Sequence, residues 1–156
     1  MKKTHFFIFL IIGLVTISAC SYSKVRISVE IEKSNDESLN KGIMLPFEIV
    51  ATENTDEIER IGPDQWFKVR HNYSVYSQFE NFKQNMNTKD FFIGIDKLKN
   101  VKKIIVFANY AQNTNKNDQF VTINLMPGKY CYRIVLEHNK MRLKNEQYSN
   151  MNHFTF

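Results

Sequence analysis

The chain has 156 residues, with 21 Lys and Arg against 16 Asp and Glu and a formal net charge of +5. This length fits one domain behind a short leader, and the mild, dispersed positive charge argues against a nucleic-acid-binding protein. Thirteen Phe and seven Tyr beside only five Gly and three Pro indicate a packed, β-rich core rather than a disordered chain.

The first 19 residues have the pattern of an export signal. Lys2 and Lys3 precede an apolar run over residues 6–17. As a helix this run rises about 18 Å, which is short of the roughly 30 Å of a bilayer core. We therefore expect residues 1–19 to be a cleaved signal peptide rather than a membrane span.

The end of this segment, Ile17-Ser18-Ala19-Cys20, resembles the lipobox of bacterial lipoproteins. The resemblance implies that Cys20 receives a diacylglyceryl group and, after cleavage, an amide-linked acyl chain such as palmitate. Two or more chains anchor a protein stably where one does not. The residue after the cysteine is Ser21 rather than Asp, which by the same resemblance favours the periplasmic face of the outer membrane. Residues 20–24 are then a short lipidated tether.

Two other interpretations of this segment stay open. One is a plain secretory signal with an accidental cysteine, which would give a soluble periplasmic protein. The other is an uncleaved membrane anchor. Removal of Lys2 and Lys3 with the signal lowers the formal net charge to +3.

The mature chain begins with a clear strand pattern. Apolar and polar residues alternate over residues 25–32, which predicts a strand with one buried face. The polar residues 33–42 predict a loop. A second strand is predicted at residues 43–51, in which Pro46 suggests a sheet edge or a bulge.

The next segment favours helices. Thr52 or Asn54 could cap a helix over residues 56–61, and Asp64 could cap a second helix over residues 65–70. Aromatic residues at positions 73, 76, 79 and 82 recur at a spacing of three, which favours a helix that continues to about residue 85. We therefore expect a helical insertion around residues 54–85.

The C-terminal half predicts further strands at residues 91–95, 103–110, 120–125, 130–136 and 141–143, with a final edge strand at 153–156. Polar residues 111–118, the pair Pro127-Gly128 and residues 138–140 supply the turns. Strands with such short connections favour an all-β fold, a single antiparallel β-sandwich domain over residues 25–156. A parallel α/β sheet would need helices between the strands.

No catalytic or metal-binding pattern stands out. The histidines are single and the acidic residues 53–59 lie along a predicted helix start, which suits a solvated face better than an acid–base pair. Cys131 lies in an apolar strand pattern and is predicted to be a buried thiol. We expect no enzyme activity, no metal and no cofactor.

The segment around the only tryptophan is the most unusual local feature. Trp66 stands beside Phe67, with Arg70 one turn on, and Trp and Arg are enriched at binding hot spots. These three residues are candidates for partner binding. The alternative is that Trp66 anchors its helix to the sheet. On length and polarity, loops 33–42 and 111–118 are further candidate partner surfaces.

The lipobox, the size, the strand set and two phrases, Asn87-Thr88-Lys89-Asp90-Phe91-Phe92 and Leu125-Met126-Pro127-Gly128-Lys129-Tyr130, resemble the outer-membrane lipoprotein of type VI secretion (the TssJ family). The resemblance implies a transthyretin-like sandwich whose exposed loops hold the periplasmic part of an inner-membrane secretion-system protein. This sequence departs from the family in one respect: an extra strand and loop lie between these two phrases. The alternative function is a lipoprotein that binds an envelope surface or an apolar ligand, with no secretion role.

Overall fold

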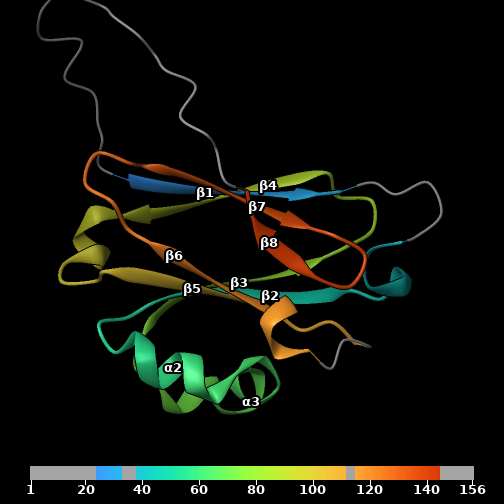
Figure 1. The fold of residues 1–156 in the computed structure, drawn as a ribbon, viewed down its shortest axis with the longest axis horizontal. Coiled ribbons are helices and arrows are strands. Elements are labelled where there is room, and N and C mark those ends of the chain that lie inside the picture. Colours follow the sequence, from blue (N-terminus) through green and yellow to red (C-terminus); the bar gives the residue numbers. More distant parts are fainter. Residues whose placement is uncertain (1–23, 33–37, 112–114, 145–156) are drawn as a thin grey trace, which may run out of the picture.

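The computed structural model describes residues 24–32, 38–111 and 115–144. The lipobox, the predicted strand at 153–156 and part of each predicted partner loop lie outside the described residues. The described chain forms two four-stranded sheets that face each other, with two helices below the second sheet in the view of Figure 1. Among the described residues, no helix is long and apolar enough to cross a membrane.

The first sheet has the strand order β4-β1-β7-β8. Its strands are β1 (Lys24–Ile31), β4 (Thr88–Gly94), β7 (Cys131–Leu136) and β8 (Met141–Leu143). The pairs β1–β4 and β7–β8 are antiparallel, but β1 and β7 run parallel, with Arg26 opposite Cys131. This parallel pair departs from the fully antiparallel arrangement expected from the sequence.

The second sheet has the order β3-β2-β5-β6 and is antiparallel throughout. Its strands are β2 (Leu45–Ala51), β3 (Tyr76–Phe82), β5 (Lys103–Ala108) and β6 (Phe120–Asn124). The predicted β-sandwich is confirmed.

The core lies between the two sheets and follows from the alternation in the strands. In β1 the apolar residues Val25, Ile27 and Val29 are 4%, 0% and 0% exposed, and the residues between them point outward. Phe47 of β2 packs against Phe82 with ring centroids 5.1 Å apart. Full burial of one large apolar side chain contributes about 1.5–3 kcal/mol, so this inter-sheet layer is the main source of stability.

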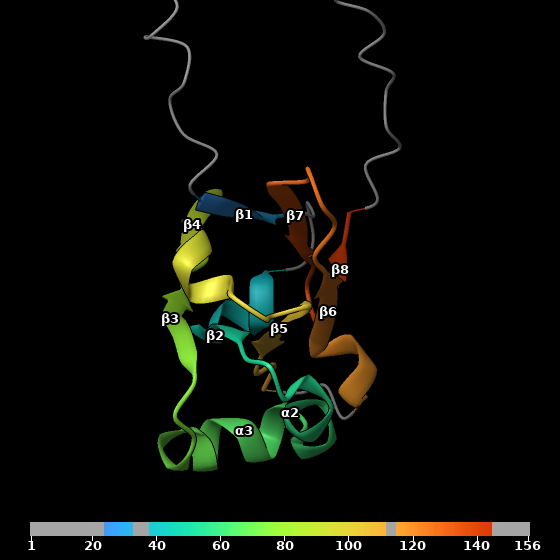
Figure 2. The same ribbon diagram turned by 90° about the vertical axis from the view of Figure 1, so that its left-hand side faces the viewer.

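Two helices, α2 (Thr55–Ile61) and α3 (Pro63–Val69), cover the outer face of the second sheet (Figure 2). They bury Val50, Ile105 and Phe107, which point away from the inter-sheet core. This second apolar layer explains why β2 and β5 are nearly continuous apolar runs, since both faces of these strands are covered.

Of the predicted helix caps, Asn54 is confirmed as a position and Asp64 is wrong. Asn54 is the N-cap of α2, but its side chain binds Glu57 rather than a backbone N–H of the first turn. Asp64 lies inside the first turn of α3, where Gly62 is the N-cap and Pro63 begins the helix. Gly62 has a φ of +72°, a conformation that glycine adopts without a steric penalty, so it allows the sharp turn between the helices.

The predicted helix over residues 73–85 is wrong. Helical structure ends with the 3₁₀ turn η2 (Arg70–Asn72), and residues 76–82 form β3. In a strand, the spacing of three places successive aromatics on opposite faces: Phe82 is fully buried in the core, whereas Phe79 is 43% exposed on the outer side.

The expectation that Pro46 marks a sheet edge is also wrong. Strand β2 is an inner strand, bonded to β3 on one side and to β5 on the other. Pro46 is tolerated because it is the second residue of the strand, where the β5 ladder has not yet begun. Its carbonyl accepts a hydrogen bond of 2.9 Å from the backbone N–H of Asn109.

The sandwich has two distinct ends (Figure 1). The β1-start end comprises Lys24, the turn η3 (Ile95–Leu98) and residues 126–129 before β7. In that last turn, the predicted Pro127-Gly128 turn is confirmed, because Lys129 N donates to the Met126 carbonyl at 3.1 Å and Gly128 has a φ of +79°. The loop end, at the opposite side of Figure 1, comprises residues 38–44, 83–87, 109–111 and 137–140.

Candidate functional site

At the loop end, Asn40 joins three loops through its side chain and its backbone. Its Oδ1 accepts a hydrogen bond of 2.8 Å from the backbone N–H of Ala111, and its Nδ2 donates to the Met44 carbonyl at 3.2 Å. Its own backbone N–H donates to the His138 carbonyl at 2.9 Å. Asn40 is only 5% exposed. Parts of both predicted partner loops therefore meet at one buried polar residue. The β7–β8 turn meets them there, although the sequence had not indicated this turn as a partner surface.

Asn40 begins a left-handed turn within η1 (Leu39–Gly42). The φ angles of Asn40, Lys41 and Gly42 are +47°, +54° and +80°. Asn and Gly tolerate this conformation, whereas a residue such as lysine loses roughly 1–2 kcal/mol in it. The next two residues, Ile43 and Met44, are 56% and 54% exposed. The turn thus holds two large apolar side chains in solvent beside the loop junction.

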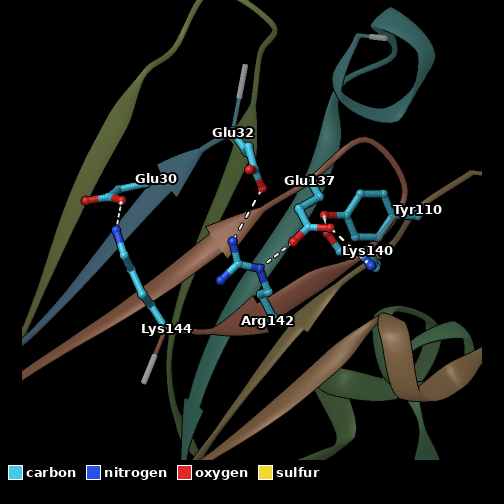
Figure 3. A network of polar contacts seen from close by, with 7 residues as sticks. All are labelled: Glu30, Glu32, Tyr110, Glu137, Lys140, Arg142 and Lys144. Atoms are coloured by element: carbon cyan, nitrogen blue, oxygen red, sulfur yellow. Dashed lines mark hydrogen bonds and ion pairs between the residues drawn. The ribbon is translucent and has the colours of Figure 1, made fainter. Parts of the chain in front are cut away.

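A polar network lies next to this junction (Figure 3). Arg142 of β8 binds Glu137 and also contacts Glu32 at 3.5 Å, and Lys140 lies 3.3 Å from Glu137. The hydroxyl of Tyr110 donates a hydrogen bond of 2.7 Å to the Lys140 carbonyl. The turn from β7 to β8 is therefore tied to the end of β1 and to the loop after β5.

The protonation states of this network follow from its contacts. Burial raises the pKa of Glu137, but hydrogen bonds from Arg142 and Lys140 outweigh that effect and hold the pKa below its ordinary value. Burial and the charge of Glu137 raise the pKa of Tyr110 far above its ordinary value. At neutral pH, Glu137 is ionised and Tyr110 is neutral, so the network is a fixed set of charges.

The second candidate surface is α3, and here Trp66 is fully buried. Its indole Nε1 donates a hydrogen bond of 3.0 Å to Glu48 of β2, and its ring stacks on Phe107 of β5 at 5.5 Å. Trp66 thus anchors α3 to the second sheet, as the alternative interpretation held. It can contribute to partner binding only by positioning its half-buried neighbours.

Those neighbours are Arg70 and Phe67. Arg70 Nη1 donates to Glu48 at 3.0 Å, and its guanidinium lies 4.3 Å from the ring centroid of Phe79 and 5.9 Å from that of Phe67. This geometry is a cation–π arrangement on the surface. An open pocket of about 320 Å³ lies beside it, lined in part by His71. Sequence reasoning missed Phe79 because it had placed this residue on a helix.

The remaining sequence candidates are placed as follows. Cys20 lies outside the described residues. Cys131 was expected to be buried but is half-buried at the start of β7, where Arg26 Nη2 lies 3.5 Å from its Sγ. In the described ranges, no group of three or more His, Cys, Asp or Glu could hold a metal ion.

Comparison with known proteins gives a likeness in structure alone. No protein-family model matches the sequence, and no curated protein matches it. The lipoprotein TssJ1 of the type VI secretion system (T6SS) from Pseudomonas aeruginosa is 7% identical over 78% of this chain and 95% of its own, with a TM-score of 0.62. Serratia marcescens Lip, a membrane-bound component of that system, is 14% identical over 78% of this chain and 98% of its own, with a TM-score of 0.59.

A third match is a chain in a structure described as the T6SS protein TssM C-terminal domain from EAEC. It is 12% identical over 79% of this chain and 98% of its own, with a TM-score of 0.62. At identities this low, the likeness shows a shared fold and does not show a shared function. Over most of its length, this chain has the β-sandwich fold of the type VI secretion lipoproteins.

Proposed function

We propose that this protein is a lipid-anchored structural component of an envelope-spanning secretion machine of the type VI kind. Lipid on Cys20 holds it at the periplasmic face of the outer membrane, and the loop end holds the periplasmic part of an inner-membrane partner. The observation that carries the proposal is the likeness in fold to type VI secretion lipoproteins over more than three quarters of the chain, in a sequence that also has a lipobox.

The arrangement of the two ends supports this role. Lys24 is the first residue of β1 and lies four residues after Cys20. Because β1 runs the length of the sandwich, the tether enters at one end and the loop end lies at the other (Figure 1). A protein anchored in this way presents the Asn40 junction and the exposed Ile43 and Met44 away from the membrane.

The alternative of an apolar ligand between the sheets has less support. The space between the sheets is filled by side chains such as Ile27, Ile49 and Ile134, all with no exposed surface. Phe47 also contacts Phe91 across the core, at a ring distance of 5.6 Å. Such a core has the close packing of a protein interior, and a ligand would need to displace it.

The test is recovery of the partner from detergent-solubilised envelopes with an affinity-tagged form of this chain. We expect an inner-membrane protein with a large periplasmic domain. The double substitution Ile43→Asp with Met44→Asp should lower recovery at least about tenfold, because burial of two apolar side chains is replaced by desolvation of two charges.

The matched control is Phe92→Asp. Phe92 is 51% exposed on β4, close to the exposure of Ile43 and Met44, but it lies near the β1-start end. Equal recovery with the loop variant and the control would remove the loop end as the binding surface. Recovery of a lipid or small ligand in place of a protein would favour the alternative function.

A further inference from the structure

Exposed lysines surround the first residue of β1. Lys24 lies opposite Gly94 in the ladder with β4, and η3 follows Gly94 directly, with Lys97 in the turn and Lys99 after it. All three lysines are exposed. Two strands that are far apart along the chain therefore place positive charge at the point where the tether enters the domain.

The turn before β7 brings further residues to the same end. The backbone N–H of Arg26 donates to the Tyr130 carbonyl at 2.8 Å, which places residues 126–129 beside the start of β1. Lys129 lies in this turn, and Met126 is 53% exposed. Across β1, Ile95 of η3 is 43% exposed. Figure 1 shows η3 and this turn at the same end of the sandwich.

The charge of this end is positive after its own pairs are counted. In Lys24 and residues 94–102, lysines outnumber carboxylates: Lys24, Lys97, Lys99 and Lys102 are exposed beside one carboxylate, Asp96. Beyond them, Lys103 and Asp56 pair with each other at 3.6 Å. Asp96 is 72% exposed and lies 3.4 Å from Lys97. Such exposed pairs are weak, so they leave a net attraction for an anionic surface.

We propose that the β1-start end rests on the anionic phospholipid headgroups of the membrane that holds Cys20. This inference rests on the proposed function through the lipid on Cys20. Four residues from Cys20 to Lys24 span at most about 14 Å, so Lys24 lies within or near the screening distance of about 8–10 Å from the headgroups. Clusters of lysine near a membrane surface bind anionic lipid, and Ile95 and Met126 can enter the interface.

Docking would fix the orientation of the domain on the membrane. A flexible tether alone would let the domain rotate freely, whereas contact of this end with the headgroups holds the strands of the first sheet at a steep angle to the membrane. The loop end is then presented towards the periplasm.

The experiment uses the mature, lipid-carrying protein in vesicles of phosphatidylcholine, with and without phosphatidylglycerol. A fluorophore is attached at Asn124→Cys, at the end of β6 next to this surface, or at Ile43→Cys at the loop end, both in a Cys131→Ser background. A headgroup-attached quencher reports which label lies at the membrane. We expect quenching at position 124 only, dependent on phosphatidylglycerol and reversed by salt.

The charge-reversal variant Lys97→Glu with Lys99→Glu should lower the ratio of docked to undocked protein more than about tenfold. The matched control, Lys41→Glu with Lys83→Glu, makes the same change of charge at two exposed lysines of the loop end and should leave docking unchanged. Equal effects of the two variants would mean non-specific attraction and would overturn the proposal.

The remaining outcomes separate the two proposals. If the protein is on the vesicles but the two labels are quenched alike or not at all, docking fails and anchoring stands. If its mass shows no lipid on Cys20 and the protein stays off the vesicles, the anchoring in the proposed function fails, and docking falls with it.

Discussion

The indole of Trp66 donates a hydrogen bond to the carboxylate of Glu48, and both side chains are buried beneath α3. The same carboxylate oxygen accepts a hydrogen bond from Arg70. Glu48 is thus the one charged residue of the inner strand β2. It is tolerated there because it accepts hydrogen bonds from Trp66 of α3 and from Arg70 of the adjoining turn η2. This pair of contacts fixes α3 on the sheet and also orients the half-buried Arg70.

We predict that Glu48→Ala destabilises the protein by about 3 kcal/mol, because it leaves the Trp66 N–H without its acceptor and Arg70 without its counter-charge. Trp66→Phe should cost about 2 kcal/mol, through lost volume and one lost hydrogen bond. Denaturant unfolding measures both. Glu53→Ala, at an exposed carboxylate, is the control and should change stability by less than about 0.5 kcal/mol. A similar small effect for Glu48→Ala would show that the buried contacts contribute nothing.

The Asn40 junction can be separated into its backbone and side-chain parts. Asn40→Gly keeps the left-handed backbone and removes only the side-chain hydrogen bonds to Ala111 and Met44, at a cost of about 1–3 kcal/mol. Asn40→Ala should cost roughly 1 kcal/mol more, because alanine is disfavoured at positive φ. Thermal unfolding of the two variants measures the difference. If Asn40→Ala proved as stable as Asn40→Gly, residue 40 would not adopt the left-handed backbone conformation in solution.

Gly42 offers an independent test of the same turn. A Cβ at this position would meet no atom closer than 3.7 Å, so Gly42→Ala should lose stability only through its φ of +80°, about 1 kcal/mol. Gly42→Asn should lose less, since Asn tolerates positive φ better. The midpoints of denaturant unfolding measure the stability of both variants. A large loss of stability for both would indicate steric crowding by the new side chain rather than an effect of backbone conformation.

The stabilising effect of Glu137 should depend on pH. Its pKa in the folded protein lies below the ordinary value of 4.5, so the unfolded chain binds more protons and stability rises with pH in this range. The contribution is complete above pH 4.5 and is lost as the pH falls through the lower, folded value. Glu137→Gln should therefore be less stable than the parent at pH 7 by up to about 1 kcal/mol.

The gap between the parent and Glu137→Gln should close in acid. Unfolding curves for both proteins, measured from neutral to strongly acidic buffer, provide the comparison. A gap that stays constant over this range would mean that the carboxylate charge does not stabilise the β7–β8 turn.

We predict that Cys20→Ala gives a folded protein that is no longer anchored. It should move to the soluble periplasmic fraction, and under the proposed function secretion should be lost as well. Fractionation of cell envelopes, with circular dichroism of the purified variant as the folding control, measures this. Continued recovery of the variant with the membrane would contradict lipid anchoring through this residue.

The sequence predicted best those elements whose burial follows a simple pattern. Strand β1 has one buried face and alternates cleanly, and β5 is covered on both faces and is continuously apolar, so both were found to within two residues. Strand β3 failed because its aromatics serve two different layers. Phe82 packs in the inter-sheet core and Phe79 lies by α3, so no single period describes them.

The candidate sites were predictable only in part, because the residues that meet in them lie far apart along the chain. The polar loops at 33–42 and 111–118 were recognised, but the bond between Asn40 and Ala111 joins residues 71 positions apart. The selection of Trp66 and Arg70 reflected their residue types, while their common partner Glu48 lies in a strand before the helices. The parallel pairing of β1 with β7 likewise has no local sequence signal.

That parallel pairing has a mechanical consequence. Strand β1 is bonded on both sides, to β4 and to β7, and the chain enters it at Lys24. If the protein is anchored and bound as proposed, tension between Lys24 and the loop end would act along the axis of this strand. Hydrogen bonds in both ladders lie across that axis and must shear together, whereas an edge strand pulled along its axis is held by one ladder only. Strand β1 is thus placed to pass tension applied at Lys24 to the strands on both of its sides.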